Sequence, residues 1–185
     1  GSEMCIRDRY DNMLARYARE GAKARGSKAV IYDLRGNVGG SDSWPRKWIQ
    51  SFLGTQNSIE TSMLYAQKNS ALFAAENSES LLPEDEGTCF AREVHGTWYE
   101  NDIPIIVLVD DHCGSSGEGA VQLLKTLDNV LIVGSNTAGY QLCGNISTFT
   151  LPYTGIGVRF GSTLFLYGDG ENVDHRGYAL SLIHI

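Results

Sequence analysis

The sequence predicts an α/β domain with a mostly parallel sheet, helices packed against it and a β-hairpin toward the C-terminus. Short runs rich in β-branched residues at 29–34, 103–110 and 130–133 are typical of buried strands. Helical patterns follow the first two runs, one beginning near Ser43 and one at 120–127. Strands that alternate with helices favour βαβ units, and therefore parallel pairing.

The N-terminal part is predicted to begin with a helix over residues 10–25, in which apolar side chains recur at helical spacing until Gly26 ends the pattern. Turn residues at 35–40 then separate the first strand from the second helix. Either Ser41 or Asp42 is suited to cap that helix.

Two later regions are less regular. Residues 55–100 combine an alanine-rich patch at 71–75 with an acidic, proline-containing loop at 82–87, and we interpret this region as an insertion or a partner-facing segment. Residues 145–167 alternate between apolar and polar side chains and predict two more strands. An antiparallel hairpin around 152–155 is one way to pair them.

Both ends of the chain resemble in-frame translations of DNA used to build sequencing libraries. Residues 4–9 correspond to ATG TGT ATA AGA GAC AG, and the reverse complement of that element encodes the six residues 180–185. We expect residues 1–9 and 180–185 to be adapter-derived, and residues 10–179 to be the native part of a longer protein. The alternative is a genuine start and stop of unusual composition.

Charge and cysteine spacing exclude several classes of partner and ligand. A formal net charge of −7 without a Lys/Arg cluster argues against nucleic acid or an anionic membrane surface. No apolar run approaches the ~20 residues of a membrane span. Cys89, Cys113 and Cys143 lack the spacing of a metal site, and the acidic loop at 169–174 fails the register of a calcium loop. We therefore expect no metal and no cofactor.

The strongest candidate for chemistry is the turn that connects the 103–110 strand to the following helix. It places the hydroxyls of Ser115 and Ser116 at the carboxyl edge of a parallel sheet, beside N–H groups of a helix N-terminus that stabilise an oxyanion. Helix capping alone also explains either serine. The glycines in 37–40 form a second cluster of exposed N–H groups, although paired glycines often mark only a turn.

Segments at 31–40, 107–118 and 133–139 together resemble, in order and spacing, the C-terminal-processing (tail-specific) serine peptidases and their tricorn-core and interphotoreceptor retinoid-binding relatives. The resemblance implies a ClpP/crotonase-like ββα superhelix, a peptide or protein substrate and no cofactor. It also implies an exported bacterial parent, which would allow a Cys113–Cys143 bridge. The composition equally fits a cytosolic protein.

The same resemblance assigns roles to individual residues. Ser115 is the implied nucleophile, and the backbone N–H of Ser116, together with that of Gly39 or Gly40, forms the oxyanion hole. Glu118, three residues after the nucleophile, is expected to be structural because a carboxylate is favoured near a helix start.

The sequence departs from the family at the general base. Processing peptidases carry a lysine just after the Thr-x-Gly turn, where this chain has Tyr140. Tyrosine, which ordinarily ionises at about pH 10, is a poor base at neutral pH. The departure favours the tricorn-like branch, in which a histidine deprotonates the serine and an acidic residue supports the site. Asp174 matches the position of that acid, and the histidine would precede residue 10.

These features predict a truncated serine peptidase domain over residues 10–179 that acts through a Ser115 acyl-enzyme and has little or no activity as built. The alternative is a non-catalytic module on the same fold that binds a peptide or an apolar ligand. A crotonase-type acyl-CoA enzyme shares the fold but does not need a serine at this position.

Overall fold

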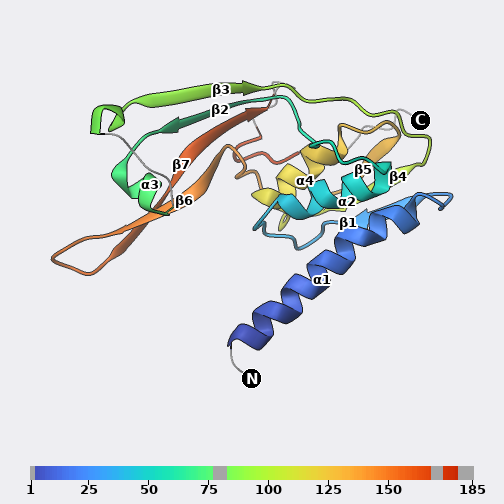
Figure 1. Cartoon of the computed structure of the whole chain (residues 1–185), viewed down its shortest axis with the longest axis horizontal. Coiled ribbons are helices and arrows are strands. Elements are labelled where there is room, and N and C mark those ends of the chain that lie inside the picture. Colours follow the sequence, from blue (N-terminus) through green and yellow to red (C-terminus); the bar gives the residue numbers. More distant parts are fainter. Residues whose placement is uncertain (1–2, 77–82, 168–172, 179–185) are drawn as a thin grey trace.

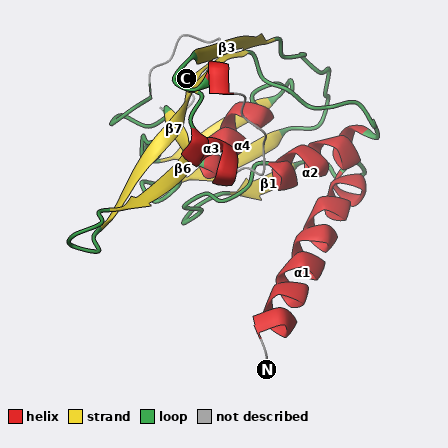
Figure 2. Ribbon diagram, turned by 60° about the vertical axis from the view of Figure 1, so that its left-hand side comes forward, coloured by secondary structure: helices red, strands yellow, loops and turns green. Residues whose placement is uncertain are grey.

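The computed structural model describes residues 3–76, 83–167 and 173–178 of the chain. Its strands form two sheets: a three-stranded sheet in the order β1-β4-β5 and a four-stranded sheet in the order β3-β2-β7-β6. Figures 1 and 2 show α2 and α4 beside the first sheet and α1 projecting away from them toward the N-terminus, while the second sheet extends to one side as an arm.

The first sheet is parallel and forms the centre of the molecule. It consists of β1 (Val30–Asp33), β4 (Ile105–Val109) and β5 (Val130–Gly134), with β4 between the other two. Alternate residues of β4 are buried, as the pleat of a strand requires. The predicted parallel sheet with packed helices is therefore confirmed.

Helices cover this sheet through apolar side chains at helical spacing. On α2 (Ser43–Leu53), Trp48 and Phe52 are almost fully buried, and their rings stack with centroids 5.2 Å apart. Helix α4 (Ser116–Leu124) is buried along nearly its whole length. Helix α1 (Glu3–Ala24) approaches α2 closely at Gly21, where an added Cβ would lie 2.3 Å from the carbonyl oxygen of Trp48.

The arginine that follows α1 fastens it to α2. The guanidinium of Arg25 donates hydrogen bonds to the carbonyl oxygens of Ser51 and Phe52, each at 2.6 Å. These carbonyls belong to the last turn of α2, where helical acceptors lack partners and a positive charge is favoured. Gly54, with φ of +71°, ends the helix in the left-handed conformation.

The second sheet is antiparallel and contains β2 (Met63–Lys68), β3 (Cys89–Val94), β6 (Cys143–Thr150) and β7 (Gly157–Tyr167). The connection from β2 to β3 includes α3 (Ala71–Glu76) and the short 3-10 helix η1 (Pro83–Asp85). Strands β6 and β7 pair from Cys143 opposite Leu164 to Thr150 opposite Gly157.

This second sheet corrects one expectation. Four of the strands in the described residues form an antiparallel sheet, so the strands are not mostly parallel. The 55–100 region, which we interpreted as an insertion or a partner-facing segment, contributes β2 and β3 to this arm. The physical reason is visible in β3, where Cys89–Val94 contains no buried residue and therefore no apolar alternation. No helix in the described part of the chain is both long enough and apolar enough to cross a membrane.

Candidate active site

Ser115 lies between β4 and α4 in a conformation that side-chain-bearing residues rarely adopt. Its φ is 53° and its ψ is −124°, and it is the last residue before the first turn of α4. Its N–H donates to Oε2 of Glu118 at 3.1 Å, while its carbonyl accepts from Gly119 at 3.0 Å. Strained backbone of this kind clusters at functional sites, where the surrounding structure holds it in place.

Glu118 provides much of that surrounding structure. Its side chain is completely buried, and its carboxylate accepts four hydrogen bonds. Besides the N–H of Ser115, the donors are the Thr137 hydroxyl at 2.6 Å, the Gly139 N–H at 2.8 Å and the Tyr140 N–H at 3.1 Å. A buried carboxylate needs such donors to offset its lost hydration. Glu118 therefore fixes the serine turn to the turn that follows β5.

The 173–178 segment joins the same network. The Thr137 hydroxyl accepts a hydrogen bond from the Tyr178 N–H at 2.7 Å, and the N–H of His175 donates to the carbonyl of Gly139 at 2.6 Å. Asp174 lies in this segment, with Oδ2 3.5 Å from Nε2 of its neighbour His175. The structure thus brings the Asp174 segment against the 137–139 turn.

The glycine loop after β1 packs directly on the serine turn. A Cβ added at Gly39, whose φ is +106°, would lie 2.7 Å from Cβ of Ser115, so only glycine fits there. The Gly114 N–H donates to the carbonyl of Asn37 at 3.0 Å, and the Ser116 hydroxyl donates to the carbonyl of Gly40 at 3.2 Å. The two turns predicted to form an oxyanion hole are therefore in contact.

Hydrogen bonding distinguishes the two glycines of that loop. The Gly39 N–H donates to Oδ1 of Asn37 at 3.1 Å, so it already has a partner. Among the described residues, the N–H groups of Gly40 and Ser116 have no hydrogen-bond acceptor. The Gly40 and Ser116 N–H groups are therefore available to a ligand, whereas that of Gly39 is not.

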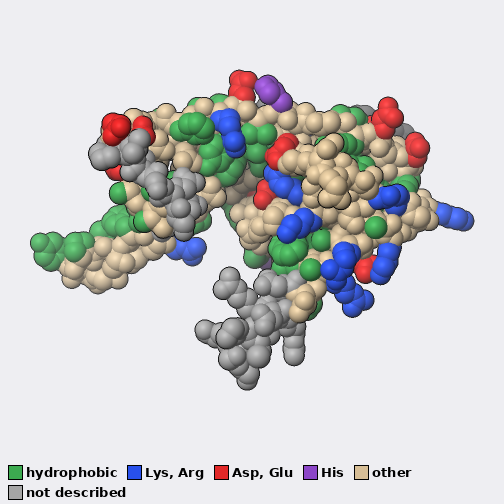
Figure 3. Space-filling model, viewed as in Figure 1, with side chains coloured by type: hydrophobic (Ala, Val, Ile, Leu, Met, Phe, Trp, Pro, Cys, Tyr) green, Lys and Arg blue, Asp and Glu red, His purple; other side chains and the backbone are tan. Residues whose placement is uncertain are grey.

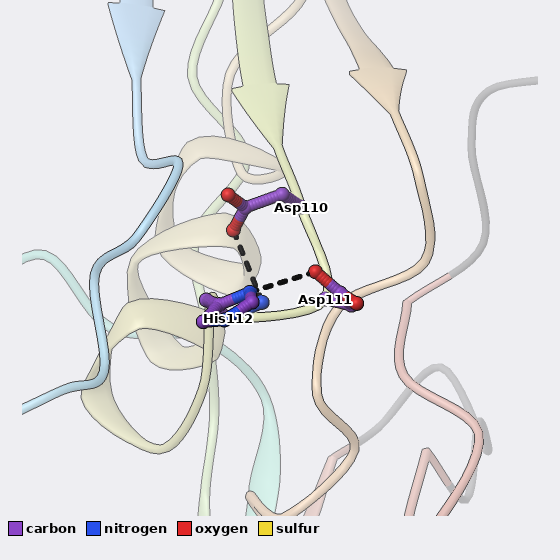
Figure 4. A group of neighbouring side chains, drawn as sticks. All are labelled: Asp110, Asp111 and His112. Atoms are coloured by element: carbon purple, nitrogen blue, oxygen red, sulfur yellow. Dashed lines mark hydrogen bonds and ion pairs between the residues drawn. The ribbon is translucent and has the colours of Figure 1, made fainter.

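Asp110 follows β4 and lies beside Asp111 and His112 (Figure 4), and its carboxylate joins this turn to the loop after β1. Its Oδ1 accepts from the Gly36 N–H at 2.9 Å and from the His112 N–H at 3.1 Å. The hydrogen bond from Gly36 is the main reason that the pKa of Asp110 lies below its usual value. The adjacent His112 is exposed, and its hydrogen bond with Asp111, 2.8 Å between Nδ1 and Oδ1, raises the pKa of the imidazole.

The ligand atoms of Asp110, Asp111 and His112 all lie within 4.8 Å of one another, close enough for a shared cation. Asp110 is committed to backbone donors, however, and the other two side chains are exposed. Of the three side chains, Asp110 alone contacts the Gly36 loop, through the Gly36 N–H.

A cleft of about 800 Å³ opens at Ser115 and extends under the arm. Figure 3 shows the molecule hollowed between the β6–β7 arm and the helical part. A second, mainly apolar cavity of about 550 Å³ lies on the other side of the glycine loop, and Gly40, Ser41 and Ser116 border both spaces. Asp174 is not among the described residues that line either one.

The described lining of the Ser115 cleft contains no lysine and no histidine. Its tyrosines are poorly suited to replace them. Burial raises the pKa of Tyr167 to about 12. Tyr140 lays its ring on the serine turn, since a Cβ added at Gly114 would lie 2.1 Å from Cζ of that ring. The one carboxylate in the described lining, Asp42, is paired with Arg46.

The cysteines near the site are free. Cys113 is buried beside the serine turn, and burial raises its thiol pKa to about 12. Cys143 is exposed at the start of β6 and lines the cleft. The bridge between Cys113 and Cys143 that an exported parent would allow is thus not formed.

Two functional contributions escaped the sequence analysis. Asp110 was not singled out, and Glu118 was expected only at its own helix start, whereas it also binds the 137–140 turn. Their long-range partners are mostly backbone N–H groups, those of Gly36, Gly139 and Tyr140, and no side-chain pattern marks such donors. The Asp110 carboxylate at the end of a buried strand was the one available signal.

Comparison with known proteins identifies the family. The sequence matches peptidase family S41 over residues 7–179, and the chain belongs to that family. No curated protein sequence matches it.

Solved structures support the same fold. The photosystem II D1 C-terminal processing protease is 17% identical, with a TM-score of 0.56 over 92% of this chain and 39% of its own. Mature CPAF in complex with lactacystin is 16% identical, with a TM-score of 0.58 over 90% of this chain and 41% of its own. The chain thus spans about two fifths of the length of these structures.

Proposed function

We propose that this chain is the portion of a serine peptidase that supplies the nucleophile, Ser115, and its oxyanion hole. The observation that carries the proposal is the contact between the strained Ser115 turn and the Gly39–Gly40 loop, beside two N–H groups without acceptors. Membership of a peptidase family supports it. We assign the fold to the ClpP/crotonase-like class as part of the same proposal.

The proposed reaction begins with attack of Ser115 Oγ on the scissile carbonyl carbon. The carbonyl oxygen becomes an oxyanion that accepts hydrogen bonds from the N–H groups of Gly40 and Ser116, aided by the positive end of the α4 dipole. The serine proton passes to a general base and from there to the leaving amine. Water then hydrolyses the acyl-enzyme and regenerates the serine.

The base in this proposal is a histidine upstream of residue 10, and Asp174 supports it. The Asp174 turn contacts the 137–139 turn, which Glu118 in turn joins to Ser115, so a supporting acid is plausible on geometric grounds. Because the described cleft lining holds no histidine or lysine, and its one carboxylate, Asp42, is paired with Arg46, we expect the chain to cleave peptides very slowly or not at all.

A fluorophosphonate probe tests the assignment of the nucleophile. At alkaline pH, where hydroxide substitutes for the base, the probe should label the chain, and peptide mapping should locate the adduct on Ser115. Ser115→Ala should abolish labelling, whereas Ser116→Ala, the matched control, should retain it because the backbone N–H remains. Equal labelling of the chain and of Ser115→Ala would refute the proposal.

A second candidate function is a non-catalytic module that binds a peptide or an apolar ligand, favoured by the lack of lysine and histidine in the described cleft lining. A longer version of the chain that includes the upstream segment separates the two. If Ser115 is a nucleophile, the longer protein should label much faster at pH 7 than this chain. If it is not, neither protein should label at Ser115 while peptide binding persists.

A further inference from the structure

Arg159 is an isolated charge on the arm. Residues 129–168 contain no other charged side chain, although a fifth of the whole chain is charged. Among the described residues, the Arg159 guanidinium has no ion pair and no hydrogen-bond acceptor. An arginine carries five N–H donors in a planar fork, and here they are available to a ligand.

The strand register places Arg159 on the side of the sheet that faces the Ser115 cleft. Residues of β7 that are an even number apart share a face, and Arg159, Phe165 and Tyr167 all line the cleft. Glu93 is the one carboxylate on the four described strands of this sheet. It pairs with Leu64, which in turn pairs with Leu166, and paired residues share a face. Because Leu166 is an odd number of residues from Arg159, Glu93 lies on the face opposite Arg159. No carboxylate of the sheet neutralises Arg159 on the cleft side.

Arg159 is also the only cation in the described lining of the cleft. The one acidic side chain there is Asp42, and it is already paired, with Oδ2 3.2 Å from Nη2 of Arg46. A ligand carboxylate in the cleft would therefore find one free partner. A guanidinium binds a carboxylate through two parallel charge-assisted hydrogen bonds, which provide both affinity and orientation.

Position along the strand determines which part of a substrate Arg159 reaches. From Arg159 to Phe165 the antiparallel strand rises ~3.4 Å per residue, about 20 Å in all. The Tyr167 end of β7 lies beside α4, because the Tyr167 hydroxyl accepts a hydrogen bond from Gln141 at 2.7 Å and that amide would lie 3.4 Å from a Cβ added at Gly119. An extended peptide whose scissile bond lies at Ser115 would therefore bring residues several positions away toward the guanidinium.

We infer that Arg159 is a specificity-determining residue that selects peptides bearing a carboxylate several residues from the bond presented to Ser115. This inference rests on the proposed peptidase function for the identity of the ligand, a peptide. The carboxylate comes either from an acidic side chain or from the peptide C-terminus, since the guanidinium recognises the same group in both.

Calorimetric titration of the Ser115→Ala chain with synthetic peptides tests the inference without turnover. The reference is a neutral eight-residue peptide with an amidated C-terminus. One partner peptide has a free C-terminal carboxylate, and the other replaces an internal Gln with Glu. At least one carboxylate peptide should bind about tenfold tighter than the reference, in keeping with a charge-assisted, bidentate contact. Which of the two does so identifies the source of the carboxylate.

Two arginine variants test whether Arg159 causes the preference for carboxylate peptides. Arg159→Gln in the same background should bind all three peptides with equal affinity. Arg92→Gln is the matched control, because Arg92 shares the sheet face through its pairing with Tyr65 but does not line the cleft. It should preserve the preference. Three results would each overturn the inference. Neutral and carboxylate peptides could bind equally, no peptide could bind, or the preference could survive Arg159→Gln.

The peptide-binding result can be distinguished from the test of the proposed peptidase function. If the fluorophosphonate probe fails to label Ser115 but Arg159 still governs carboxylate binding, the peptidase assignment fails and the inference stands. If Ser115 is labelled but the peptides show no preference, the inference alone fails.

Discussion

The parallel core and the antiparallel arm differ in how they use apolar side chains. In the core, Phe52 is 2% exposed within a continuous apolar cluster, whereas on the arm Phe160 remains 42% exposed. The core holds the two loops of the candidate site at the carboxyl ends of β1 and β4. The arm provides nearly half of the described residues that line the cleft, and the core and its loops provide the rest. The difference teaches that close packing positions the candidate site from one side, while an exposed sheet adds a wall to the cleft from the other.

Matched phenylalanine substitutions test that contrast most strongly. Phe52→Ala should lower the free energy of unfolding by about 3–5 kcal/mol, because it leaves a cavity beside Trp48. Phe160→Ala should cost about 1 kcal/mol, chiefly through its edge contact with Phe149. Urea denaturation followed by tryptophan fluorescence measures both. Similar losses for the two variants would show that the arm is packed as tightly as the core.

Removal of the buried Glu118 carboxylate should cause the next largest loss of unfolding free energy. Glu118→Gln keeps the shape but presents an amide group to backbone donors, so we expect a loss of about 3 kcal/mol in unfolding free energy. The Gly139 and Tyr140 N–H groups should also exchange faster with deuterium. Glu93→Gln, on the exposed arm, is the control and should change stability by less than about 0.5 kcal/mol. Unchanged protection at both N–H groups would contradict the role of Glu118.

Glycine substitutions sharpen the comparison within the core loop itself. Gly39→Ala combines left-handed strain with a clash against Ser115 and should cost about 2–3 kcal/mol, while Gly36→Ala meets no atom within 4 Å and should cost about 1 kcal/mol. Gly39→Ala should also abolish fluorophosphonate labelling, which Gly36→Ala should retain. Equal stability losses would mean that the loop moves away from the serine turn without penalty.

The smallest expected effect is a pH dependence at Asp110. Its pKa is lower in the folded than in the unfolded chain, so its contribution to stability is present above the unfolded value of about 3.9. That contribution disappears as the pH falls through the lower folded value. Between pH 6 and pH 3 the urea midpoint of Asp110→Asn should therefore fall less than that of the unmodified chain. Asp102→Asn, at an exposed position, should follow the unmodified chain.

The core was the more predictable region. The β-branched runs of β1, β4 and β5 reveal their strands even though Ile31 and Val133 remain exposed, because β-branched residues favour strands. The turns after β1 and β4 could be singled out from their glycines and serines. Strands β2 and β3 depend on pairing with β7 and with each other, which leaves little local pattern. The Glu118 network escaped for a similar reason, since three of its four donors are backbone N–H groups, two of them brought to the carboxylate only by folding.

The contact between Tyr140 and Gly114 has a consequence for sequence variation. Gly114 does not have a positive φ, so its own backbone conformation accepts alanine, and the aromatic ring of Tyr140 occupies the space that a Cβ would need. A homologous chain with a small residue at position 140 is therefore free to gain a side chain at position 114. Gly39, by contrast, is excluded from such an exchange by its backbone. Positions 114 and 140 should covary among relatives, whereas position 39 should remain glycine in all of them.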